Sequence, residues 1–340
     1  MSKWIFSALA LVACAGVPQQ PTEWEVQGAS IRALAVAGQD TVLFAGSKGR
    51  WGVTFDAGRT WHLDTLTVAG EQPEVRAVAI VGGAAVAVSV GSPGYFMRTE
   101  DWRRWEVVHR EEGEGVFWDA VAFWNDREGL AFGDPSAPDA RCASVALTHD
   151  GGRSWERVPC DRLPAALPGE AAFAASNTNV VARGDAAWCI TGGAASRVLH
   201  TVDRGQTWTA TDTPILQGGP MTGMFSLTMW SATEGLAIGG NWEDMDDASA
   251  NKVRTSDGGR TWHLDQPGAG PGYRSCIQAV PGTEGLGLWA VGIPGIDRSS
   301  DGGLTWVHEP DSSFLTVRFT PDGSTAWLAG RGRIAARPVH

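Results

Sequence analysis

Three arginines stand at equivalent positions of a repeating sequence pattern, and together their side chains could bind an anion. Arg32, Arg76 and Arg274 each lie near the start of an expected β-strand, in the first, second and sixth repeat units. Glu170 and Tyr273 lie one residue before the same position in their own units. The planar guanidinium group of arginine suits bidentate pairing with carboxylate or phosphate. The pattern therefore predicts a binding site for a small anion or an acidic peptide at one mouth of the fold.

Carboxylates at related positions leave two other interpretations open. Asp119 occupies the arginine position of the third unit, and Asp134 lies in a loop expected on the same face. With Glu170, they could simply neutralise the arginines and hold neighbouring units together. With Tyr273 added, they could instead form the catalytic set of a sialidase-like glycoside hydrolase, since paired carboxylates supply an acid and a base. The Arg-Ile-Pro motif of sialidases is absent from the sequence, so our leading interpretation assigns no catalytic residue.

An acidic loop at residues 243–247 carries four carboxylates in five residues. Their spacing does not match an EF-hand loop, so we expect a solvated loop and no metal site. Trp242 precedes these carboxylates and is a candidate contact for a partner. The sequence also lacks the motifs of nucleophile elbows, zinc proteases, P-loops and dinucleotide-binding turns. We therefore expect no cofactor.

The charge balance of the chain disfavours nucleic acid as a partner. Lys and Arg number 27 against 38 Asp and Glu, which gives a net charge of −11 at pH 7. Nucleic-acid binders are expected to show a basic balance. An arginine cluster in such an acidic chain is therefore a local feature.

One eight-residue motif recurs along the chain and explains why tryptophan is so frequent. It reads Thr/Ser-x-Asp-x-Gly-x-Thr/Ser-Trp and occurs at residues 54–61, 148–155, 201–208, 255–262 and 299–306, with a degenerate copy at 99–105. Asp and hydroxyl side chains can bond their own backbone in a tight turn, and Gly supplies a positive φ. The motif thus predicts hairpin turns, each followed by a Trp that packs between sheets. We assign its aspartates a structural role and no catalytic one.

Short alternating strands surround each motif and give four strands per unit. The first strands of the later units are expected near Val75, Trp118, Ala171, Phe225, Tyr273 and Phe314. Four-stranded units of 40–50 residues are typical of propeller blades. Counting units predicts an all-β, seven-bladed β-propeller in which residues 22–26 supply the missing outer strand of the last blade. Such closure would pair the two ends of the chain.

The motif resembles the Asp-box, or BNR, repeat, and the mature chain resembles bacterial relatives of the photosystem II stability/assembly factors. Matching segments lie at residues 123–124, 133–135, 167–176, 225–227 and 272–275. The resemblance implies a seven-bladed propeller with an arginine-rich surface that assists assembly of a membrane complex. Asp-boxes also occur in sialidases and sortilin-type receptors, so the repeat alone does not select a function.

The first residues have the pattern of an export signal. Lys3 precedes an apolar run of about ten residues, shorter than the ~20 that a membrane helix needs. The run ends at Cys14, in a sequence that resembles the bacterial lipobox; ordinary cleavage near this cysteine is the alternative. We predict a lipoprotein signal peptide at residues 1–13 and a single propeller domain at 14–340. The mature protein would be lipid-anchored to the cell envelope, on the periplasmic face of the outer membrane in a Gram-negative host.

Export also places the remaining cysteines in an oxidising compartment. Cys142 and Cys160 lie symmetrically about an expected tight turn near Gly151, so a disulfide between them is one interpretation. Two small buried side chains are the other. Cys189 and Cys276 are expected to be unpaired core residues.

Together these observations favour a non-enzymatic envelope scaffold that binds or assembles a partner. The expected partner is another envelope protein, an acidic peptide or a small anion. Contact with the membrane is expected only through the lipid anchor, and the protein is expected to be a monomer. The alternative function is the sialidase-like hydrolase.

Overall fold

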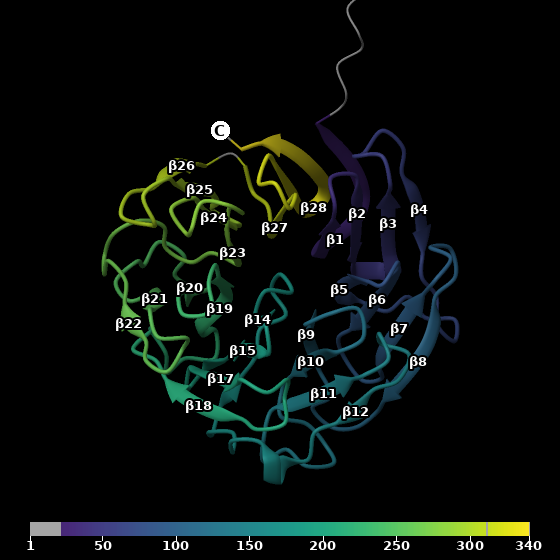
Figure 1. The fold of residues 1–340 in the computed structure, drawn as a ribbon, viewed down its shortest axis with the longest axis horizontal. Helices are drawn as coiled ribbons and strands as arrows, with labels where there is room; N and C mark the ends of the chain where they lie inside the picture. The colour runs from purple at the N-terminus through teal and green to yellow at the C-terminus, as the bar shows by residue number, and fades with distance from the viewer. Residues whose placement is uncertain (1–21, 311, 340) are drawn as a thin grey trace, which may run out of the picture.

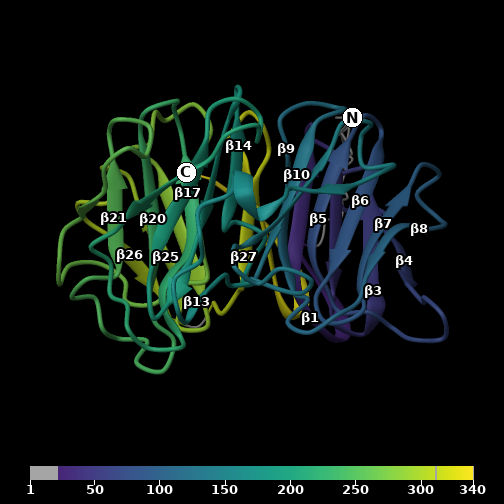
Figure 2. The same cartoon turned by 90° about the horizontal axis from the view of Figure 1, so that it is seen from below.

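A computed structural model describes residues 22–310 and 312–339, which form a ring of β-sheets around a central axis (Figure 1). The predicted signal peptide and Cys14 lie outside the described residues. Seen from the side, the strands run roughly along the axis (Figure 2). No helix among the described residues is long and apolar enough to cross a membrane. The fold is therefore an all-β propeller, as the sequence predicted.

The described residues form six hydrogen-bonded sheets, four with four strands and two with six strands. The first six-stranded sheet contains, in spatial order, β27 (Thr316–Phe319), β28 (Thr325–Pro338), β1 (Glu23–Ala37), β2 (Thr41–Gly46), β3 (Arg50–Thr54) and β4 (His62–Thr65). The second contains β13 (Glu170–Ala171), β16 (Gly192–Gly193), β19 (Thr222–Met229), β20 (Gly235–Asn241), β21 (Lys252–Thr255) and β22 (His263–Leu264).

The four-stranded sheets each form an antiparallel series of short strands. They comprise β5 (Val75–Val81), β6 (Ala84–Ser89), β7 (Gly94–Thr99) and β8 (Glu106–Glu111); β9 (Trp118–Phe123), β10 (Gly129–Gly133), β11 (Ser144–Thr148) and β12 (Glu156–Arg157); β14 (Val180–Arg183), β15 (Ala186–Ile190), β17 (Arg197–Thr201) and β18 (Thr209–Asp212); and β23 (Cys276–Ala279), β24 (Leu288–Gly292), β25 (Gly295–Ser299) and β26 (Val307–Glu309). Two 3-10 turns, η1 (Ser47–Gly49) and η2 (Cys160–Arg162), connect strands.

The predicted count of seven blades is wrong, because the two ends of the chain share one sheet. Strand β1 begins beside β28, where Trp24 pairs with Ile334, and continues without a break to pair Val36 with Val42 of β2. The expected last and first blades are therefore joined through a continuous β1, which leaves six sheets among the described residues. The N-terminal strand does pair with the C-terminal one, so the ring is closed by strand pairing, which leaves no open sheet at the junction.

The repeated motif forms the same hydrogen-bonded turn in each of its five full copies. In the first, Gly58 N–H donates to Thr54 Oγ1 (2.9 Å), and Thr60 donates to the Asp56 carboxylate through N–H (2.8 Å) and Oγ1 (2.7 Å). The corresponding bonds recur around Asp150, Asp203, Asp257 and Asp301. Gly58 has a φ of +83°, and a Cβ there would lie 2.5 Å from the Trp24 ring. The aspartates therefore hold turns, and the glycine lets the sheets approach.

Residues 172–179, here called the central segment, form hydrogen bonds with residues of several different sheets around the ring. Val121 N–H donates to Asn177 Oδ1 (2.9 Å), and Asn177 Nδ2 donates to the Val78 carbonyl (2.9 Å). Further bonds join the segment to Leu227, Ser275 and Arg318. The sequence had predicted a strand from Ala171, but the inner strand β14 starts only at Val180. Small side chains and the positive φ of Asn177 (55°) suit this crowded segment better than a regular strand.

Candidate functional site

Arg32 and Arg76 lie together where the central segment reaches the inner strands β1 and β5. Arg32 Nη1 donates to the Ala175 carbonyl (3.0 Å), and Arg76 Nη1 donates to the Ala174 carbonyl (2.9 Å). Arg76 also forms an ion pair with Glu74 (2.6 Å). The structure thus brings two of the three predicted arginines together and uses part of their hydrogen-bonding capacity on backbone carbonyls.

A third cation at this place is Arg331, which the sequence analysis did not identify. The pKa of Arg32 is lowered to about 10, first by burial and then by the neighbouring charge of Arg76, with a smaller contribution from Arg331. Arg331 is exposed, pairs through its backbone with Ser30, and makes no side-chain hydrogen bond or ion pair within the part of the chain that the structure describes. We call Arg32, Arg76 and Arg331 the cationic mouth. Three guanidinium groups with Glu74 as a neighbouring carboxylate favour the approach of an anion.

Arg274 lies in a buried ion pair away from open solvent. Its Nε donates to Asp297 Oδ2 (2.5 Å) and its Nη1 donates to the Tyr273 carbonyl (2.7 Å), while the residue is only 4% exposed. Asp297 is also 2.9 Å from His308 Nδ1. Neither Asp119 nor Glu170 neutralises this arginine. Because Arg274 is already satisfied and buried, it supports the scaffold, and it is not available to a ligand.

Asp119 and Asp134 are two poorly solvated carboxyl groups, and the charges of Asp134 and Arg76 act on Asp119. Asp119 is fully buried, and neither of its carboxylate oxygens has a hydrogen-bond partner among the residues that the structure describes. Burial, followed by the charge of Asp134, raises its pKa well above the usual value, while Arg76 opposes the shift. Burial raises the pKa of Asp134 to about 6, although Ala172 N–H donates to it (2.6 Å). Both groups therefore take up a proton more readily than exposed aspartates.

The residues of the predicted hydrolase set do not present an open carboxylate pair. Glu170 is only 8% exposed, and Arg197 holds its carboxylate at 2.6 Å while Thr191 Oγ1 donates to it at 2.7 Å. Tyr273 is 3% exposed, and burial raises its pKa to about 12. With Asp119 fully buried as well, the geometry gives no observation that favours glycoside hydrolysis.

An apolar cluster meets the cationic mouth at Ala175 of the central segment. Ala175 packs with Phe225 and Tyr273, and the partly buried side chains of Phe173, Met221 and Met245 lie against them. Trp242 N–H donates to the Met221 carbonyl (3.0 Å), and Trp242 is 40% exposed. Trp242 was a predicted contact residue; the two methionines were not identified, because no motif marks them.

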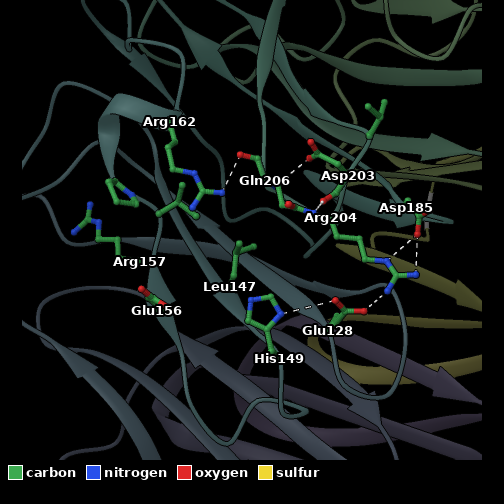
Figure 3. A pocket seen from close by; sticks show the side chains of 13 residues that line it. Glu128, Leu147, His149, Glu156, Arg157, Arg162, Asp185, Asp203, Arg204 and Gln206 are labelled. Carbon is green, nitrogen blue, oxygen red and sulfur yellow. Dashed lines mark hydrogen bonds and ion pairs between the residues drawn. The ribbon is translucent and has the colours of Figure 1, made fainter.

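A groove of about 810 Å³ lies elsewhere, between the sheet of β9, β10, β11 and β12 and the sheet of β14, β15, β17 and β18 (Figure 3). Its charged side chains are largely engaged with one another. Arg204 contacts Glu128 and also Asp185 (2.7 Å), and Arg162 Nη2 donates to the Gln206 carbonyl (2.8 Å). None of the ligand residues predicted from the sequence lines this groove.

Cys142 and Cys160 form a disulfide with a Cα–Cα separation of 5.5 Å, near the groove and away from the mouth. Cys189 and Cys276 are buried free thiols. Among the described residues no group of three or more His, Cys, Asp or Glu side chains could hold a metal ion.

Comparisons with known proteins relate this chain to other propellers through its fold. YCF48 bound to D1 peptide is 14% identical with a TM-score of 0.63, and the match covers 95% of this chain and 99% of that chain. YCF48 from Cyanidioschyzon merolae is 14% identical with a TM-score of 0.65, covering 94% and 98%. U3-55K is 12% identical with a TM-score of 0.64, also covering 94% and 98%.

YCF48 is a photosystem II assembly factor. At identities this low, the comparisons show only that this chain shares the propeller fold of these proteins. No family model matches the chain, so the BNR repeat family inferred from the motif gains no support from that comparison. No curated protein matches it either.

Proposed function

We propose that this protein is a non-enzymatic binding or assembly scaffold of the cell envelope whose cationic mouth binds an acidic peptide or a small anion. The observation that carries the proposal is the gathering of Arg32, Arg76 and Arg331 beside one carboxylate, Glu74. Arg331 supplies an exposed guanidinium group, and Arg32 retains N–H groups beyond the one that bonds Ala175. The propeller of YCF48 bound to D1 peptide supports peptide binding as a use of this fold.

We also propose where in the cell the protein is located. The sequence before the ring favours export and lipidation at Cys14, which would hold a monomeric propeller at the envelope, next to another envelope protein as its partner. Mass spectrometry of the mature protein tests this part, because an unmodified N-terminus would contradict it.

The binding proposal is tested with a fluorescently labelled, capped tetraglutamate peptide and fluorescence anisotropy at pH 7. Arg331→Ala should weaken binding about tenfold, because a hydrogen bond to a charged group contributes about 1.5–3 kcal/mol and 1.4 kcal/mol is a factor of ten. Raising the salt concentration should also weaken binding, because exposed charges are screened within ~10 Å at 0.1 M.

A matched control is Arg59→Ala, which removes an exposed arginine from a motif turn. This variant should bind the peptide like the original protein. Two results contradict the proposal: no binding by the original protein at low salt, or equal losses for Arg59→Ala and Arg331→Ala, which would indicate unspecific attraction.

A further inference from the structure

The cationic mouth continues directly into the apolar cluster through one residue of the central segment. Ala175 accepts the Arg32 hydrogen bond with its carbonyl and packs its side chain with Phe225 and Tyr273. The Phe225 ring stacks on Phe173, with centroids 4.0 Å apart and planes within 8°. Tyr273 meets Phe225 edge to face at 4.8 Å. A ligand group that pairs with Arg32 therefore lies next to a rigid aromatic support.

The outer side of this cluster is incompletely covered. Phe173, Met221 and Met245 are each partly exposed, and Trp242 is 40% exposed beside Met221. We call these four residues the apolar shelf. Methionine side chains adapt their shape to different apolar groups, and tryptophan supplies a large contact area. The shelf can accept an apolar side chain, which a small inorganic anion does not have.

The apolar shelf ends at the acidic loop. Tyr273 N–H donates to the Met245 carbonyl (2.9 Å), which fixes this loop against the aromatic cluster. Glu243, Asp244 and Asp246 are exposed, and none of the three forms an ion pair within residues 22–310 and 312–339. Positive charge at one end of the shelf is thus balanced by negative charge at the other.

We propose that the cationic mouth, the apolar shelf and the acidic loop form one recognition strip for an extended peptide segment carrying an acidic, an apolar and a basic residue in that spatial order. The proposal rests on the proposed function, because the acidic residue of the peptide is the group that the arginines bind. The recognition strip adds two further requirements: an apolar and a basic side chain that follow the acidic one, and the direction in which the peptide lies.

Charge complementarity selects this occupant over a uniformly acidic one. A fully acidic segment would meet repulsion at Glu243, Asp244 and Asp246, whereas a lysine there gains attraction. An anionic bilayer surface would meet the same repulsion. Alternate side chains of an extended chain point to one side, so every second residue of the peptide can face the strip.

The test uses three labelled, capped peptides and fluorescence anisotropy at constant salt. The first has the order Glu-Ser-Leu-Ser-Lys, the second reverses Glu and Lys, and the third replaces Leu by Ser. Reversal should weaken binding at least tenfold, because it places like charges together at both ends. Loss of Leu should weaken binding about fivefold or more.

Variants of the protein assign these effects to the strip. Trp242→Ala should weaken binding of the first peptide about fivefold and leave binding of the third peptide unchanged. Asp244→Asn together with Asp246→Asn should reduce the preference for the first peptide over the reversed one. Leu304→Ala removes an apolar side chain that is 59% exposed in the motif turn between β25 and β26, and it should leave the binding of all three peptides unchanged.

The two proposals fail in different ways. If all three peptides bind equally and Arg331→Ala weakens the binding of all of them, the recognition strip is wrong and the proposed cationic mouth stands. If none of the three binds, and tetraglutamate does not bind either, the proposed function itself falls.

Discussion

At the scale of single residues, Asp134 gives the protein a dependence on pH that can be measured. Burial raises its pKa from 3.8 to about 6, so the folded chain binds this proton more tightly than the unfolded chain does. The resulting stabilisation is fully present below pH 3.8 and is lost as the pH rises through 6. Asp134→Asn should therefore raise the melting temperature at pH 7, by the equivalent of at most about 3 kcal/mol, and this advantage should shrink toward pH 5.

Differential scanning calorimetry of both proteins at pH 7, 6 and 5 measures this difference. Burial also lowers the pKa of His200, but it does so in both proteins, so its effect on stability cancels in the comparison. Asp246→Asn, at an exposed position, should show no such trend. An advantage of Asp134→Asn that is as large at pH 5 as at pH 7 would exclude the raised pKa as its cause.

The residues of the candidate site could be predicted from the sequence only in part. Arg32 and Arg76 were found because strand register places them at the same height near the axis. Arg274 shares that register, yet it forms a buried ion pair with Asp297 of β25, which β24 separates from β23 in the same sheet. No local sequence pattern predicts that pairing. Arg331 was missed because it lies at the bend of β28, outside the aligned strand starts.

At the scale of structural elements, the motif turns should lose stability in acid. Hydrogen bonds, first from the Thr261 hydroxyl, lower the pKa of Asp257 to about 2. A lowered pKa stabilises the fold above pH 3.8, and this contribution is lost as the pH falls toward 2. Asp257→Ala should lower the melting temperature at pH 7 by the equivalent of ~1 kcal/mol, and the deficit should narrow between pH 4 and pH 2. Ser256→Ala, within the same turn, should have little effect in the same thermal scans; a deficit that stayed constant down to pH 2 would contradict this explanation.

These turns were predictable because eight consecutive residues contain both the donors and the acceptors. The central segment was not predictable for the opposite reason. Its hydrogen-bond partners come from strands on several sides of the ring, from Val78 and Val121 to Leu227 and Arg318. The alternating pattern after Ala171 resembles a strand locally, and only the closed ring supplies these partners.

At the scale of the whole molecule, the number of sheets in the ring depends on one continuous strand, β1. The sequence predicted the pairing of residues 22–26 with the C-terminal strands, and Trp24 does pair with Ile334. The motif spacing also predicted that residues 22–26 and the first strand of the first unit belong to two separate blades, whereas both lie in β1. The structure keeps β1 continuous and has six sheets across the residues it describes, so strand pairing joins the two ends of the chain.

This junction leads to a prediction for the stability of the complete ring. Trp24 stacks on Trp327 with centroids 5.4 Å apart and meets Trp61 edge to face at 5.7 Å, so it ties the last strands to the first motif turn. Trp24→Ala should destabilise the protein by about 3 kcal/mol, because it leaves a cavity among large aromatic rings. If the ring unfolds as one unit, urea denaturation should show a lower midpoint with an unchanged slope.

The control is Trp242→Ala, at an exposed tryptophan, which should leave the urea midpoint unchanged. A separate early transition in Trp24→Ala, with the main midpoint unmoved, would instead mean that the ends of the chain open independently and that strand pairing at β1 does not hold the ring together.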